Sequence, residues 1–176
     1  MMGTPARVLD RFPGERPRIG TLDGIAFMAV GTYTWPDESN PIQLRDDHDA
    51  IRWLQDNVQG TPVLAEASVG YYREFGGRVS SYTGLPAVYN DQHQREQRYG
   101  WQTAQRSYLV GDFFTTPDPR RTLEIARDLA IEYVYIGPLE RTQHPNAAAK
   151  FDRLAKDKLI SIVYQNSQVT IYRVDQ

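Results

Sequence analysis

Several features that would assign a function directly are missing from this sequence. It contains no cysteine, which excludes disulfides, zinc–thiolate sites and cysteine nucleophiles. Its longest apolar stretch, Ile25–Val30, is far shorter than the roughly 20 residues that a membrane-spanning helix needs. Twenty basic and 22 acidic residues give a formal net charge of −2, so no electrostatic footprint for nucleic acid or an anionic membrane is visible. We therefore expect no nucleic-acid partner.

Sequence motifs for cofactors, metals and common hydrolases are also missing. There is no Walker loop, G-x-G-x-x-G, H-E-x-x-H, G-x-S-x-G or EF-hand loop. The histidines at 48, 93 and 144 lie far apart in sequence, and none has a helically spaced metal-ligand partner. The acidic run Asp46–Asp49 lies where a helix is expected to begin, and consecutive helical residues point in different directions. We expect neither a metal nor a cofactor.

The chain's 176 residues fit one domain with a sizeable core. Residues 1–20 hold three prolines and four arginines and are typical of a linker or extended arm. Residues 21–176 are expected to form a single α/β domain. Residues 31–41 are expected to form a loop because they include Pro36, Asn40 and Pro41.

Strand and helix signals alternate along that domain. The apolar pattern predicts strands near 62–66, 78–82, 131–136, 159–164 and 169–174. It predicts helices near 45–58, 92–110, 117–130 and 145–156, the third of them capped by Thr116 with Pro117 in its first turn. This order indicates a layered α/β domain with a mainly parallel (mixed) sheet, helices packed on it, and an antiparallel C-terminal edge hairpin.

The run Glu132-Tyr-Val-Tyr-Ile-Gly-Pro-Leu-Glu-Arg141 is the most informative stretch. Its buried strand stops at Gly137-Pro138, which places an acid and a base at the C-terminal end of the strand. In an open α/β sheet, ligands usually bind at that edge. Glu66, Tyr72, His93 and Glu140 follow strands or chain breaks. The full set of candidate ligand-binding residues is Glu66, Tyr72, Arg78, Tyr82, His93, Arg98, Glu140 and Arg141.

Carboxylates and planar arginines at such an edge suit hydroxyl-rich ligands, which they can bind through paired hydrogen bonds. A buried glutamate paired with an arginine can equally hold a loop in place. The residue types leave both roles open, and no catalytic residue can be assigned.

Five stretches, taken in order and rough spacing, carry a resemblance to a known group of proteins. They are Asp47-x-x-Ala-Ile-x-Trp-Leu54, Asn57-Val-x-Gly-x-Pro-Val63, Glu66-Ala67, Gly77-Arg-Val-Ser-Ser-Tyr-Thr-Gly-Leu-Pro86 and the run ending at Arg141. Together they resemble the soluble C-terminal part of the "YYY"-type polytopic membrane proteins of bacteria and archaea. Those proteins resemble membrane glycosyltransferases that use lipid-linked sugars.

The resemblance extends over roughly residues 21–174. It implies an extracytoplasmic domain that follows many membrane spans, with the membrane portion of its own parent chain as a partner. His93 and Arg98 match a histidine and an arginine of the family pattern. Asn90-Asp91 stands where a Gly-Trp pair is expected, and Gln97 replaces a second tryptophan. The loss of two aromatic residues weakens the expectation of a shared ligand.

The leading hypothesis is a non-catalytic accessory domain of a membrane glycosyltransferase-like protein that contacts a saccharide or lipid-linked sugar. One alternative is a free-standing small-molecule-binding protein or hydrolase that uses Glu66, His93 and Glu140, and that is cytoplasmic if the chain is complete. Another is a purely structural domain that docks on its own membrane portion.

Overall fold

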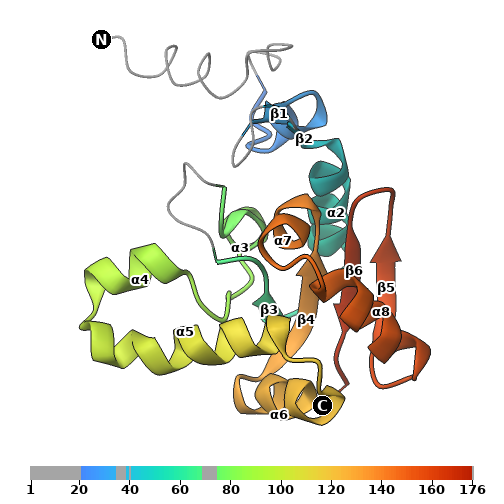
Figure 1. The fold of residues 1–176 in the computed structure, drawn as a ribbon. Helices are drawn as coiled ribbons and strands as arrows, with labels where there is room; N and C mark the ends of the chain where they lie inside the picture. Colours follow the sequence, from blue (N-terminus) through green and yellow to red (C-terminus); the bar gives the residue numbers. More distant parts are fainter. Residues whose placement is uncertain (1–20, 35–38, 40, 69–74, 176) are drawn as a thin grey trace.

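A four-stranded mixed sheet lies at the centre of the protein (Figure 1). The computed structural model describes residues 21–34, 39, 41–68 and 75–175. The strands are β3 (Val63–Ala65), β4 (Ile131–Ile136), β5 (Ser161–Gln165) and β6 (Thr170–Arg173), in the spatial order β3-β4-β6-β5. The predicted strands near 62–66, 131–136, 159–164 and 169–174 therefore share one sheet. The predicted linker at residues 1–20 lies outside the described residues.

The strand directions agree with the predicted mixed sheet. β3 and β4 are parallel, with Leu64 opposite Tyr133. β4 and β6 are antiparallel, with Val134 opposite Tyr172. β5 and β6 form the predicted antiparallel hairpin at the C-terminal edge. Parallel pairing requires a long crossover connection, and the described residues of the connection between β3 and β4 include four helices.

Helices cover both faces of the sheet (Figure 1). The helices are η1 (Ala26–Ala29, a 3₁₀ helix), α2 (Arg45–Asn57), α3 (Arg78–Thr83), α4 (Asp91–Gln97), α5 (Gly100–Thr115), α6 (Pro119–Asp128), α7 (Pro138–Gln143) and α8 (Ala147–Lys156). Helices α5, α6 and α8 pack on one face, and α2, α3 and η1 pack on the other. Among the helices of the described residues, none is both long enough and apolar enough to span a bilayer.

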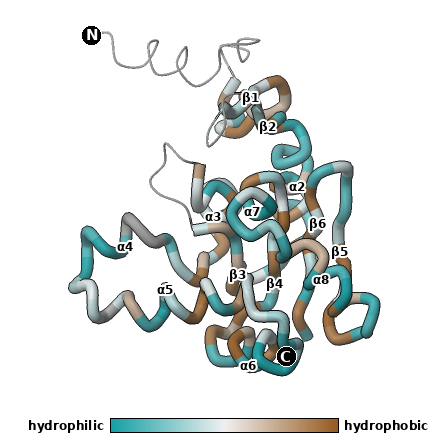
Figure 2. Tube along the Cα trace, viewed as in Figure 1, coloured by the Kyte–Doolittle hydropathy of each residue, from teal (hydrophilic) through white to brown (hydrophobic). Residues whose placement is uncertain are grey.

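Strand β4 contributes to two hydrophobic clusters because its side chains alternate between the faces. Val134 and Ile136 join the cluster under α5, α6 and α8. Tyr135 joins the cluster under α2 and α3. Figure 2 shows hydrophobic residues along the strands of the sheet and within the helices beside it. Burial on both faces explains why β4 appears in the sequence as an almost continuous apolar run.

The predicted strand at 78–82 is wrong, because these residues begin helix α3. Gly77 precedes the helix in the left-handed region with φ 70°, and Gly84 ends it with φ 76°. A Cβ atom at Gly77 would lie 2.5 Å from the side-chain nitrogen of Asn90, so only glycine fits there. The β-branched and aromatic residues suggested a strand, but the glycines at both ends and contacts from outside the segment favour a helix.

Two smaller expectations also need correction. The helix predicted at 117–130 is α6, but Asp118 rather than Thr116 caps it, by accepting a hydrogen bond from the backbone N–H of Arg120 at 2.9 Å. Pro119 rather than Pro117 stands in its first turn. The predicted loop at 31–41 includes β1 (Thr32–Tyr33), which pairs antiparallel with β2 (Ile42–Gln43).

Lys150 on α8 lies among aromatic rings instead of extending fully into solvent. Its ammonium group donates to the backbone carbonyl of Phe113 and lies 4.6 Å from the ring centroid of Phe151. Burial lowers the pKa of Lys150 from 10.5 to about 8. The folded protein therefore releases this proton at a lower pH than the unfolded chain does.

This lysine predicts a pH dependence of stability. Between pH 8 and 10.5 the unfolded chain holds the proton that the folded protein has lost, so the Lys150 contribution to stability rises with pH. The unchanged protein should gain stability relative to Lys150→Met as the pH is raised from about 7 to about 9.5. Urea unfolding of both proteins at the two pH values measures this, and an unchanged difference between them would contradict it.

Candidate functional site

A buried cluster of charged and hydroxyl side chains lies where β3 and β4 end. We call it the Arg78 network, and its members are Asp47, Glu66, Arg78, Tyr135 and Glu140. Their residues are between 0% and 3% exposed. They come from five separate parts of the fold: α2, the residue after β3, α3, β4 and α7. Charged groups so deeply buried require partners inside the protein.

Asp47 binds Arg78 from one side of the guanidinium group. Its Oδ1 accepts from Nη2 of Arg78 at 2.7 Å and from Nε at 3.1 Å. The same oxygen accepts from the hydroxyl of Tyr135 at 2.6 Å. The guanidinium carbon also lies 5.2 Å from the centroid of the Tyr135 ring, a distance that permits a cation–π interaction. These contacts connect α2 and α3 to β4.

Glu140 binds Arg78 through both of its carboxylate oxygens. Its Oε1 accepts from Nη1 at 3.1 Å and its Oε2 from Nη2 at 3.0 Å, which is the paired geometry that a planar guanidinium favours. The same carboxylate accepts from the backbone N–H of Ala67 at 3.0 Å and of Gly137 at 2.9 Å. Glu140 thus connects the ends of β3 and β4 to the start of α7.

Glu66 supplies the N-terminal cap of α3 from a distant part of the chain. Its two carboxylate oxygens accept from the backbone N–H groups of Val79 and Ser80, each at 2.9 Å. The first N–H groups of a helix have no partner within the helix, so an outside carboxylate stabilises it. This contact, which joins residues 13 and 14 positions apart, is the physical reason why 78–83 form a helix.

Gly137 is required by the close packing of the network. A Cβ atom there would lie 2.9 Å from a ring carbon of Tyr135, and 3.1 Å from both Nη2 of Arg78 and Oε2 of Glu140. The turn after β4 therefore has no room for a side chain. Gly137, whose Gly-Pro pair marks the end of the strand in the sequence, also allows Arg78 and Glu140 to approach one another closely.

The three buried carboxylates differ in the direction of their pKa shifts. Burial raises the pKa of Asp47, and Arg78 only partly offsets the effect. Burial also raises the pKa of Glu66, and the hydrogen bond from Ser80 and the charge of Arg78 only partly offset it. Burial also opposes ionisation of Glu140, but its paired contact with Arg78 and its backbone N–H donors hold the pKa of Glu140 below its usual value. Burial and the neighbouring Asp47 raise the pKa of the Tyr135 hydroxyl. Asp47 and Glu140 are both counter-ions of Arg78.

The structure brings together only some of the predicted site residues. Glu66, Arg78 and Glu140 meet in the network. Tyr72 lies outside the described residues, as does the side chain of His93, whose backbone belongs to α4. The ligand-binding role assigned to all of these residues stays a prediction.

The other candidates lie outside the network. Tyr82 is half-buried on α3, with its ring centroid 6.1 Å from that of Phe27. Arg98 is exposed at the end of α4. Arg141 on α7 is half-buried, and its Nε donates to the carbonyl of Gln168 at 3.4 Å.

Sequence reasoning missed Asp47 and Tyr135 as members of the site. In the sequence, Asp47 stands out only as one member of the acidic run at the expected start of a helix. The spacing of Asp47 along the helix could have identified it. Asp47 lies on the same side of α2 as the buried residues Ala50, Ile51 and Leu54. An acid on the side of a helix that faces the core requires a buried hydrogen-bond or ionic partner.

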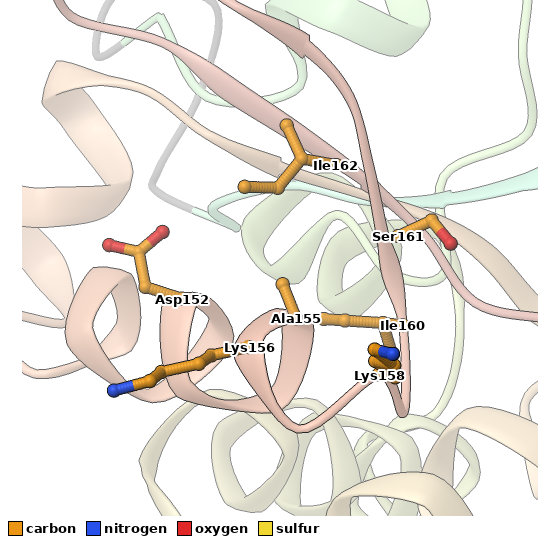
Figure 3. Close-up of a pocket in the computed structure, with 7 residues that line it drawn as sticks. All are labelled: Asp152, Ala155, Lys156, Lys158, Ile160, Ser161 and Ile162. Carbon is orange, nitrogen blue, oxygen red and sulfur yellow. The ribbon is translucent and has the colours of Figure 1, made fainter.

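A separate depression of about 660 Å³ lies between the end of α8 and β5. Figure 3 shows its lining, in which Lys156 extends away from Lys158. The carboxylate of Asp152, which also lines it, accepts from the hydroxyl of Tyr172 at 2.6 Å. Because its two cations diverge and its acid already has a partner, this depression offers no convergent set of polar groups. Within the described part of the chain, no three acidic or histidine side chains are placed to hold a metal ion.

Comparison with known proteins finds a likeness in structure but none in sequence. No family model matches the chain, and no curated protein matches its sequence. The structure is similar to the C-terminal globular domain of the oligosaccharyltransferase AfAglB-S2 from Archaeoglobus fulgidus, with 13% sequence identity and a TM-score of 0.49. The match covers 74% of this chain and 97% of that domain. A likeness at this level carries no functional argument, and the resemblance to the "YYY"-type proteins stays a prediction.

The network predicts that Arg78→Met is strongly destabilising. Removing one partner of a buried ion pair leaves an uncompensated charge, which typically costs about 3–5 kcal/mol. Urea unfolding at neutral pH measures this loss. The control is Arg153→Met on α8, whose side chain is 78% exposed and which should change stability by less than about 0.5 kcal/mol.

The loss in Arg78→Met should shrink as the pH falls from about 7 to about 5. Without the guanidinium, the folded-state pKa of Glu140 rises above its unfolded value, and that of Asp47 rises further. The folded variant then binds protons more readily than its unfolded chain does, so acid favours folding. A loss that stays constant over this range would show that the carboxylates are not the source of the instability.

Proposed function

We propose that this chain is a non-catalytic, extracytoplasmic accessory domain of a polytopic membrane glycosyltransferase-like protein, and that it contacts a saccharide or lipid-linked sugar. The observation that carries the non-catalytic part is the closure of the Arg78 network. Glu66 and Glu140, the two acids nearest the sheet edge, are 3% and 0% exposed. Their oxygens accept hydrogen bonds from the protein's own backbone and from Arg78.

An acid or base that acts on a substrate must come within hydrogen-bond reach of it. Glu140 is held in its charged form by Arg78 and two backbone N–H groups, so it is poorly suited to donate a proton to a leaving group. Glu66 uses both oxygens to hold the start of α3. These contacts favour an architectural role for both acids over the hydrolase alternative.

The membrane-protein part of the proposal is supported by the sequence resemblance. Its most specific stretches, residues 78–86 and 137–141, supply Arg78 and Glu140. The same stretches therefore contain the residues that hold the sheet edge together. In this proposal, the catalytic groups belong to the membrane portion of a parent chain, and this domain helps to shape the acceptor site.

The sugar contact is assigned to candidates that have some exposure. Arg98 is exposed, and Tyr82 and Arg141 are half-buried. Planar guanidinium groups can form paired hydrogen bonds with neighbouring oxygens, and a tyrosine offers both an apolar ring and a hydroxyl. Glu66, by contrast, should contribute to stability more than to binding.

An activity and binding screen of the purified chain tests the proposal. Chromogenic glycosides, nucleotide sugars and polyprenyl-phosphate sugars should give no turnover, because Glu66 and Glu140 at the sheet edge already have partners within the protein. Saturation-transfer NMR with oligosaccharides should give a weak signal that Arg98→Ala reduces. The matched control is Arg45→Ala, a change at an exposed arginine on α2.

Turnover that is abolished by Glu66→Gln or Glu140→Gln would contradict the accessory role, provided that each variant melts cooperatively. The control for these changes is Glu124→Gln, because the Glu124 side chain is 58% exposed on α6. A saccharide signal that is equal in the unchanged protein and in Arg98→Ala would remove Arg98 from the contact surface.

A further inference from the structure

Three large aromatic side chains are exposed on the hairpin that α4 and α5 form. Tyr99 lies between the two helices and is 75% exposed, while Trp101 and Tyr108 on α5 are 77% and 69% exposed. We call these three residues the outer aromatic face. In Figure 1 this hairpin extends beyond the sheet, away from the C-terminal strands. Rings of this size usually lie partly buried, so three exposed rings at one end of a domain indicate an interaction surface.

Helix geometry explains why these rings point outward. Trp101 and Tyr108 are seven residues apart, which is two helical turns, so they share one side of α5. The buried residues Val110, Phe113 and Phe114 occupy the opposite side and pack into the core under the sheet. The outer aromatic face is therefore a second apolar surface of α5 that the sheet does not cover.

The charge around the aromatic face is positive, unlike that of the whole chain. Residues 94–108 contain three arginines, Arg95, Arg98 and Arg106, and a single acid, Glu96. All four are exposed. The formal net charge of the complete chain is −2. The outer part of the hairpin, residues 94–108, therefore carries local positive charge, although the complete hairpin also contains Asp91 and Asp112 and is formally neutral.

We propose that the outer aromatic face docks onto the headgroup region of a bilayer that contains anionic lipid. Tryptophan and tyrosine prefer this region because each has an apolar ring and a polar group. Arginines beside them attract anionic headgroups while their apolar stems stay close to the surface. A depression of about 480 Å³ between α4 and α5, with Tyr108 and Arg95 in its lining, offers room for a headgroup.

Tryptophan, tyrosine and arginine are also enriched at protein–protein interfaces, but a stable interface has an apolar core that is fully buried. Here the exposed side chains next to the rings include Gln105 and arginines instead of a group of aliphatic residues. The docking surface does not depend on the proposed sugar-related function, because the rings and charges would bind a bilayer whatever the parent chain does.

Vesicle co-sedimentation of the purified chain tests this. Phosphatidylcholine vesicles that contain phosphatidylglycerol should retain the chain, and added salt should weaken retention.

The double variant Trp101→Ser, Tyr108→Ser should bind roughly tenfold more weakly. Arg98→Gln should reduce binding about fivefold and lower its salt dependence. Tryptophan emission should shift to shorter wavelength with vesicles in the unchanged protein and much less in Trp101→Phe.

Matched controls lie on the far side of the domain. Ile162→Ser on β5 removes a side chain of a residue that is 46% exposed, and Arg153→Gln on α8 removes an exposed charge. Both should leave vesicle binding unchanged. Equal losses in these controls would overturn the proposal. So would aromatic-dependent self-association without lipid, or saccharide binding through Trp101 and Tyr108 with no retention by vesicles. None of these outcomes depends on the activity screen.

Discussion

The buried ion pairs of Arg78 are the interaction on which the arrangement of the sheet edge depends. One guanidinium binds Asp47 on α2 and Glu140 on α7, while its own helix α3 is capped by Glu66. Separated buried charges are costly, so these elements keep their positions only together. The cluster occupies the edge at which open α/β sheets usually bind ligands. Here Arg78, Asp47 and Glu140 form hydrogen bonds and ion pairs with one another at that edge.

Because the protein's own groups fill that edge, we expect its contacts with ligands or partners to lie on the surface. The network fixes α3 and the start of α7, and thereby sets the positions of Tyr82 and Arg141. The α4–α5 hairpin lies on the chain between α3 and α6, and its inner half packs on the sheet through Phe113 and Phe114. Its outer half carries exposed aromatic rings and arginines. The core therefore holds this surface in place.

The comparison of sequence with structure separates local from distant causes. The strand at 131–136 was predicted at its exact limits because its apolar run and Gly137-Pro138 are local signals. The segment 78–82 was predicted wrongly because its helix depends on Glu66, a residue distant in sequence. Glu66, Arg78 and Glu140 were identified as candidates because each follows a strand or break. Asp47 and Tyr135 were missed because their roles depend on packing between elements.

The sequence by itself determined the mixed α/β class, the strands of the central sheet and the C-terminal hairpin, because periodicity and turn residues act over short distances. It also determined that acids and an arginine would stand near one sheet edge. Only the tertiary structure decided that these groups are buried and bind one another. Burial depends on which elements cover the edge, and here α2, α3 and α7 surround Arg78. The physical reason is that a charge left in a low-dielectric core must find its counter-charge there.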